Sequence, residues 1–188
     1  MFALSATVTP GPNNVMLLAS GANFGMRATL PHMLGISFGF PLMVFAVGLG
    51  LGAVFERVPV LHEILRWAGG AYLLWLAWRI AGAAGMGEAK NRGRPFTFLQ
   101  AAGFQWVNPK AWIMAVSAFA VYSTPETDPL SQALLFGAIF FVISFPSCGM
   151  WTGFGSAIGR ILKSARALRI FNGAMAALLV ASILLLFV

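Results

Sequence analysis

Residues 9–14 read TPGPNN (Thr9-Pro10-Gly11-Pro12-Asn13-Asn14) and interrupt an apolar run between MFALSATV and VMLLASGANFG. Each proline lacks a backbone N–H and clashes with the preceding helical turn, and the glycine between them permits unusual dihedrals. The stretch is therefore predicted to break a helix and to leave backbone carbonyls free, with two amide side chains beside the break. Broken backbone survives in lipid only where protein or a water-filled cavity covers it, so the surroundings decide what the break does.

The surroundings of this stretch are unusually apolar. Of the 188 residues, 59% are hydrophobic and 9% are charged, whereas soluble domains carry about 25% charged residues. Stretches 1–26, 28–55, 129–159 and 170–188 contain no Asp, Glu, Lys or Arg, and about 20 apolar residues suffice to span a bilayer. With two further candidates that carry charges, the sequence predicts an all-α integral membrane protein with six transmembrane helices, near 1–23, 33–55, 62–84, 97–122, 130–154 and 168–188. The connections are then expected near 24–32, 56–61, 85–96, 123–129 and 155–167.

The charged residues predict how these helices are oriented. Nine Lys and Arg residues lie at the connections after helices one, three and five, and only Arg57 and Arg66 lie at the others. Because cytoplasmic loops carry the excess of basic residues, we expect 85–96 to be a cytoplasmic loop and both termini to lie outside. The net charge of +7 is thus explained by membrane orientation, and no nucleic-acid partner is expected.

Short similarities between the two halves predict an internal repeat. LRWAGGA at 65–71 parallels LRIFNGA at 168–174, and FGFP ending at Pro41 parallels ISFP ending at Pro146. Three helices per half means that 1–84 and 97–188 are inserted in opposite orientations, an arrangement that recurs in secondary transporters. The alternative is chance similarity between Gly/Ala-rich helices.

The repeat predicts a second break, and WVNPKA at 106–111 supplies it. Asn108 and Pro109 again join an amide to a helix breaker, and paired interrupted helices point to a transporter's binding site. Lys110 is the one ionisable side chain well inside a predicted span, at a cost of about 2.5–3.5 kcal/mol. We expect it to face a central cavity and attract a carboxylate; the alternative is snorkelling to an interface.

Other residues in the spans give weaker predictions. Gln105, one turn before the second break, is the best remaining candidate for binding. Pro41 and Pro146 are candidate hinges or, equally, static kinks. Glycines at four-residue spacing, such as Gly21–Gly25, Gly35–Gly39 and Gly155–Gly159, predict close approach of helices. The single cysteine, Cys148, and two histidines predict neither a disulfide nor a metal site.

The motifs TPGPNN, GISFG at 35–39, RWAGGAYLLWLAWR at 66–79 and NPKA at 108–111 together resemble the lysine-exporter (LysE/RhtB) family of bacterial translocators, over nearly the whole chain. The resemblance implies a multi-pass protein of the bacterial inner membrane that exports amino acids, driven by the proton motive force and paired as a homodimer. The family usually has a longer lead than the eight residues before Thr9, which implies a truncated start or a short outer half of the first helix. By motif position, the resemblance carries over as pocket or gating elements Pro10, Gly11, Pro12, Asn13, Asn14, Asn108, Pro109 and Lys110.

The predicted function is therefore secondary transport. The protein is expected to export amino acids or similar zwitterionic or carboxylate metabolites by alternating access, with the two halves rocking about a central site. No nucleophile–base pair or carboxylate dyad is visible, so no enzyme activity and no cofactor are expected. The alternative is a passive channel or a structural membrane subunit, which cannot move a solute against its gradient. The residues expected to bind the substrate are Asn13, Asn14, Gln105, Asn108 and Lys110.

Overall fold

The computed structural model describes residues 1–83, 94–162 and 164–184, so most of the expected 85–96 loop lies outside the described residues. The predicted all-α class is confirmed, because every element in those ranges is helical. The elements are α1 (Phe2–Val8), α2 (Pro12–Ala46), the π-helix η1 (Val47–Leu51), α3 (Gly52–Arg57), α4 (Pro59–Gly82), α5 (Phe98–Phe104), the 3₁₀ helix η3 (Gln105–Val107), α6 (Pro109–Tyr122), α7 (Pro129–Ile161) and α8 (Ala165–Leu184).

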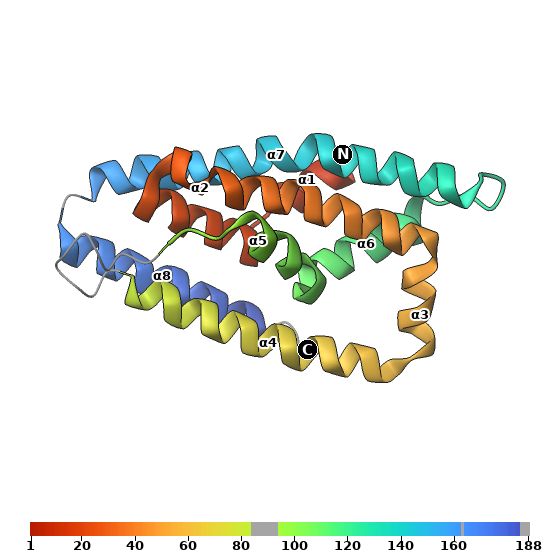
Figure 1. The fold of residues 1–188 in the computed structure, drawn as a ribbon, viewed down its shortest axis with the longest axis horizontal. Coiled ribbons are helices and arrows are strands. Elements are labelled where there is room, and N and C mark those ends of the chain that lie inside the picture. The colour runs from red at the N-terminus through yellow and green to blue at the C-terminus, as the bar shows by residue number, and fades with distance from the viewer. Residues whose placement is uncertain (84–93, 163, 185–188) are drawn as a thin grey trace.

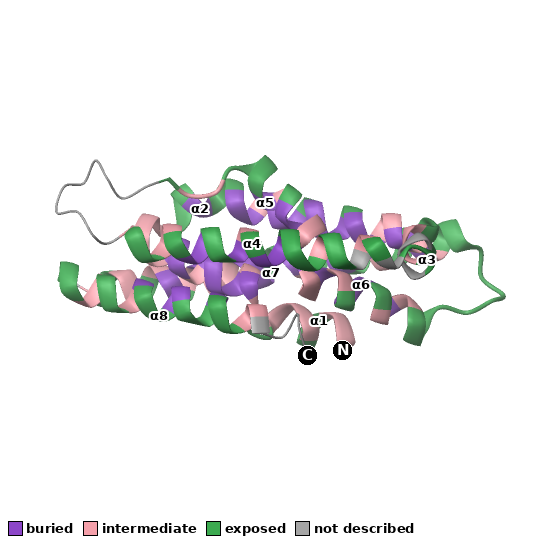
Figure 2. Ribbon diagram, turned by 90° about the horizontal axis from the view of Figure 1, so that it is seen from below, coloured by how far each residue is buried: buried purple, intermediate pink, exposed green. Residues whose placement is uncertain are grey.

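Several polar side chains are buried inside the bundle, whereas many large apolar side chains are exposed on its surface. Gln105 and Asn172 are fully buried, whereas Trp78 is 72% exposed and Leu99 is 78% exposed. Figure 2 shows the buried residues along the middle of the helix bundle and exposed ones on its outer faces. Among the described residues, three helical stretches are long and apolar enough to cross a membrane: Pro12–Leu51, Pro129–Ile161 and Ala165–Ile183.

The first of these stretches is two helices joined by a one-residue turn. Gly25 has φ 80° and ψ 172°, a conformation that only glycine adopts easily. The chain reverses direction at Gly25. This is seen from Ser20 and Thr29, on either side of the turn, whose hydroxyls lie 2.9 Å apart. The connection expected over 24–32 is therefore at the right place but too long, since one glycine of this conformation replaces a loop of several residues. The expected connection over 155–167 is too long as well, because α7 continues to Ile161.

The helices form two layers. Figure 1 shows α7 running along α2, with α4 and α8 side by side below them. Glycines allow the close contact in the first layer, because a Cβ on Gly155 or Gly159 would overlap the backbone of Leu18 or Ala22 on α2. The predicted close approach at Gly155–Gly159 is thus confirmed, whereas Gly25 serves the turn instead.

Both predicted helix breaks are confirmed. The chain leaves α1 at Val8 and enters α2 at Pro12, and α6 begins at Pro109 after Asn108 in an extended conformation. Proline stands in the first turn of both α2 and α6, where its missing N–H costs nothing. In contrast, α2 and α7 run through Pro41 and Pro146 without non-helical dihedrals at either residue. A single proline removes only one helical hydrogen bond, so neither ends its helix, and a hinge there stays a prediction.

Candidate substrate-binding site

The two breaks lie against each other, joined by Lys110. Its Nζ donates to the Thr9 carbonyl at 2.8 Å, to the Thr9 hydroxyl at 2.9 Å and to the Pro10 carbonyl at 3.2 Å. These carbonyls lack helical partners because the prolines interrupt the helix. An ammonium has three N–H donors, and the first break supplies an acceptor for each.

Gly11 leaves room for this contact. Its φ of −178° is ordinary extended backbone, so conformation does not explain the glycine. A Cβ there would lie 2.6 Å from Lys110 Cδ and 3.0 Å from its Nζ. The glycine therefore leaves the space through which the lysine reaches the freed carbonyls.

A pair of amides forms a second link between the breaks. Asn13 Nδ2 donates to Gln105 Oε1 at 2.8 Å, and Gln105 Nε2 donates back to Asn13 Oδ1 at 3.2 Å. Asn14 has a different role, because its Nδ2 donates to the carbonyls of Thr7 and Thr9 at 2.8 and 2.7 Å within its own break. Asn13 thus connects the halves, and Asn14 satisfies freed backbone.

Helix α7 closes the site from the other side. Ser147 Oγ donates to the Thr7 carbonyl at 3.1 Å, and Trp151 Nε1 donates to the Val8 carbonyl at 3.2 Å. The last carbonyls of α1 are thereby satisfied by α7 side chains. The short α1 is therefore held in place by its connection to the first break and by hydrogen bonds from α7, although none of its residues is buried.

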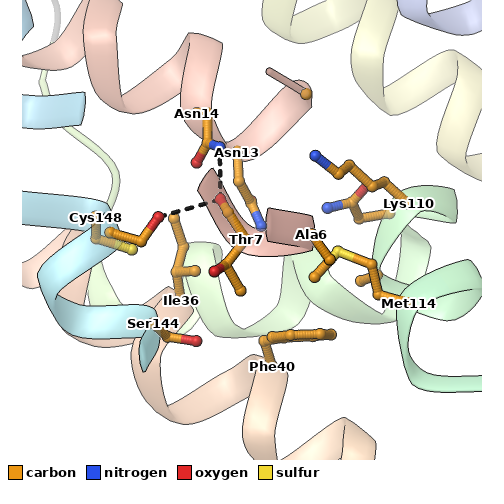
Figure 3. Close-up of a pocket in the computed structure, with 14 residues that line it drawn as sticks. Ala6, Thr7, Asn13, Asn14, Ile36, Phe40, Lys110, Met114, Ser144 and Cys148 are labelled. Atoms are coloured by element: carbon orange, nitrogen blue, oxygen red, sulfur yellow. Dashed lines mark hydrogen bonds between the residues drawn. The ribbon is translucent and has the colours of Figure 1, made fainter. Parts of the chain in front are cut away.

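Between these elements lies a small hollow of about 40 Å³. Figure 3 shows Asn13, Asn14 and Lys110 around it, with Ser144 and Phe40 across from them. The hollow is large enough for a few water molecules and is far smaller than the roughly 300–1,000 Å³ of a drug-sized ligand's pocket. Its lining comes from four predicted spans and comprises Ala6, Thr7, Gly11, Asn13, Asn14, Ile36, Phe40, Asn108, Lys110, Ala111, Met114, Ser144, Ser147 and Cys148.

Two polar atoms of the lining lack a hydrogen-bond partner. Asn108 Oδ1 and Ser144 Oγ are buried and unpaired, although most buried polar groups in proteins are satisfied. An unpaired buried group costs about 1–3 kcal/mol. Two such groups therefore face a hollow that Lys110 also lines.

The predicted site residues fall into three groups. Asn13, Asn14, Asn108 and Lys110 line the hollow, while Gln105 lies behind Asn13 and does not. Neither Pro41 nor Pro146 lines it. Ser144 was missed as a site residue, although it lies in ISFP, one of the repeated stretches. Whether these residues bind a substrate stays a prediction.

Comparison with known proteins places the chain among membrane translocators. The model of the LysE type translocator family matches residues 4–187. The chain is similar to the homoserine/homoserine lactone efflux protein of Salmonella typhimurium, with 30% identity over 181 residues that cover 92% of this chain and 85% of that protein. It is also similar to cysteine/O-acetylserine efflux proteins of Salmonella paratyphi A (32% over 134 residues, 71% and 68% covered) and Escherichia coli O139:H28 (30% over 164 residues, 86% and 83% covered). No solved structure is significantly similar to it.

Proposed function

Because this chain belongs to the LysE type translocator family, we propose that it exports small α-amino acids through the hollow between its two helix breaks. As a translocator it is a transporter and not an enzyme. The names of its relatives include homoserine, cysteine and O-acetylserine, which are amino acids with short polar side chains. Compounds of this class are the proposed substrates.

The unpaired atoms of the hollow, together with Lys110, carry this proposal. All three donors of the Lys110 ammonium are bonded to the first break, so a substrate carboxylate must displace one of them. The Pro10 carbonyl accepts the longest of these bonds, at 3.2 Å, and needs a new donor when that bond is displaced, which the substrate ammonium supplies. The Thr9 carbonyl keeps its bond from Asn14 Nδ2. A zwitterion satisfies both sides of this exchange, whereas a simple carboxylate brings no donor for the displaced carbonyl.

The helix starts favour the same substrate. Helices α2 and α6 both begin at the hollow, at Pro12 and Pro109, and the N-terminus of a helix carries partial positive charge. A carboxylate is therefore attracted from two helices as well as from Lys110. Asn108 Oδ1 and Ser144 Oγ remain as acceptors for the substrate's N–H and O–H groups.

For the architecture, we propose six spans in two inverted repeats, 1–84 and 97–188, in the bacterial inner membrane. The two breaks at corresponding places, with proline opening both following helices, support the repeat. Arg27, Arg79 and Arg160 at one end support a cytoplasmic assignment for that end, with both termini outside. Cysteines introduced at Arg166 and Thr127 should then react with a membrane-impermeant maleimide from opposite sides, and cross-linking tests the homodimer that the family resemblance implies.

We further propose alternating access coupled to the proton motive force. The hollow of about 40 Å³ is too small for a substrate in transit, which supports a cycle with a closed state. The alternative is a passive channel, which moves solute only down its gradient. Uphill export that an uncoupler abolishes distinguishes the transporter from the channel.

The proposal is tested in vesicles that contain the purified protein. Labelled homoserine should be transported, whereas 4-hydroxybutanoate, which keeps the carboxylate and hydroxyl but lacks the ammonium, should be transported at least tenfold more slowly. Lys110→Met should abolish transport, and Ser144→Ala should raise the KM for homoserine. Ser182→Ala is the matched control, because Ser182 bonds only to the Leu179 carbonyl of its own helix. Equal transport of both compounds would refute the zwitterion exchange.

A further inference from the structure

A second and larger cavity lies at the basic end of the molecule. Its volume is about 360 Å³, which is within the range of small-molecule sites. It is bounded by the part of α2 before the Gly25 turn, the end of α4 and residues 94–96. Nothing in the proposed function assigns it a role.

The mouth of this cavity carries two arginines. Arg79 and Arg94 both line it, and the Arg79 guanidinium donates to the Arg94 carbonyl at 3.4 Å. Neither guanidinium pairs with a carboxylate within residues 1–83, 94–162 and 164–184. Arg79 is held in place, since its Cζ lies 4.9 Å from the Trp75 ring centroid and 5.7 Å from that of Phe96. A guanidinium held in this way, with no acidic partner among the described residues, is suited to bind a carboxylate.

The inner wall of the cavity carries a buried histidine without a partner. His32 is 1% exposed, and neither ring nitrogen has a hydrogen bond to any residue that the structure describes. Its ring centroid lies 5.2 Å from that of Phe96, the ring that Arg79 also contacts. The His32 imidazole and the Arg79 guanidinium therefore lie against the same ring, that of Phe96. Each has nitrogen atoms that can hydrogen-bond a ligand. The other polar groups in the wall are already bonded, Ser20 to Thr29 and Asn23 to Asn172.

We infer that this cavity is a second binding site for the amino-acid substrate, in which Arg79 and Arg94 hold the carboxylate and His32 accepts from the ammonium or side chain. The inference rests on the proposed function for the identity of the ligand. It assigns the cavity the role of first capture on the basic side, before the substrate reaches the central hollow.

One face of α2 connects the two sites. Asn13 lines the hollow, and Met16, Ser20 and Asn23 line the second cavity. Their spacing of three, four and three residues places them in one stripe, about 15 Å long at 1.5 Å per residue. Met16 also packs with Leu76 and Phe104 in a buried apolar cluster. This cluster closes the path between the sites in the state described.

Equilibrium dialysis of labelled homoserine against the full-length protein in phosphatidylcholine nanodiscs tests the inference. Arg79→Gln should weaken binding about tenfold or more, because a charge-assisted hydrogen bond is lost. Arg166→Gln is the matched control at the same end, since Arg166 lines neither cavity, and it should bind like the wild type. Arg94→Gln changes an exposed side chain. It takes the place of Arg79→Gln in the test if the Arg79→Gln protein does not fold.

The outcomes separate this inference from the proposed function. Wild-type affinity in both arginine variants, with Lys110→Met abolishing all binding, would overturn the second site while leaving the central one. Loss of homoserine binding when phosphatidylglycerol is added to the nanodiscs would overturn it too, because a lipid phosphate would then be the ligand. Failure of the proposed function appears instead as absent homoserine transport in vesicles, whatever the dialysis result.

Discussion

Gly11→Ala tests the contact between the two breaks with a single methyl group. Gly11 is in extended backbone, with φ −178° and ψ 177°, which alanine adopts without strain. The new Cβ would lie 2.6 Å from Lys110 Cδ, whereas ordinary contact begins near 3.4 Å. The lysine side chain must therefore retreat by about 0.8 Å, the difference between these distances.

This retreat is large enough to break a hydrogen bond. It lengthens the bond of 2.8 Å from Nζ to the Thr9 carbonyl beyond hydrogen-bond range. A hydrogen bond to a charged group contributes about 1.5–3 kcal/mol, and each 1.36 kcal/mol is a factor of ten in rate. We expect homoserine transport by Gly11→Ala in vesicles to be roughly ten- to a hundredfold slower than by the wild type.

Two controls make the result specific. Gly103→Ala adds the same methyl group in α5, where nothing lies within 4 Å of the new Cβ, so transport should be unchanged. In a Lys110→Ala background, where transport is already expected to be lost, the clashing Cδ is gone, and Gly11→Ala should cause no further loss of stability in thermal unfolding. Normal transport by a well-folded Gly11→Ala protein, or additive effects of the two substitutions, would refute the reasoning.

The remaining predictions concern stability and access. Asn13→Ala and Gln105→Ala should each lower the free energy of unfolding, and the double variant should lose less than their sum, with a coupling of about 0.5–3 kcal/mol in thermal unfolding; additive losses would mean that the amides stabilise independently. Gly155→Ala should destabilise the protein by about 1–3 kcal/mol or more through overpacking, whereas Gly173→Ala, which has open space at its Cβ, should melt like the wild type or higher. Cys148 is 3% exposed and should react with a maleimide only after denaturation; rapid labelling of the native protein would mean that the hollow opens widely.

The sequence was sufficient to predict the breaks but not their contacts. Proline followed by an amide acts through covalent geometry that holds in any environment, so α2 and α6 begin at the expected prolines. The amide pairing of Asn13 with Gln105 joins residues 92 positions apart, and no local pattern specifies it. Gln105 was nevertheless identified, because an uncharged polar residue near a break in lipid needs a partner.

Two features were missed because their sequence signals are ambiguous. Gly25 reads as the second glycine of a close-packing pair with Gly21, and only its φ of 80° shows that this one residue makes the turn for which 24–32 was expected. This error placed His32 in an expected loop, where its burial is not foreseen. Ser144 is one of several serines in apolar stretches, and its lack of a partner among the described residues depends on the packing around the hollow.

The glycine crossing between α2 and α7 determines which parts of the molecule are free to move. The backbones of α2 and α7 touch at Gly155 and Gly159 with no side chain between them. These helices, in the first and fifth predicted spans, belong to opposite halves of the proposed repeat and are expected to move together as a rigid unit. Independent movement of the two halves would separate this contact between α2 and α7. The paired helices α4 and α8, which also come from opposite halves, are then the natural counterpart that shifts against it.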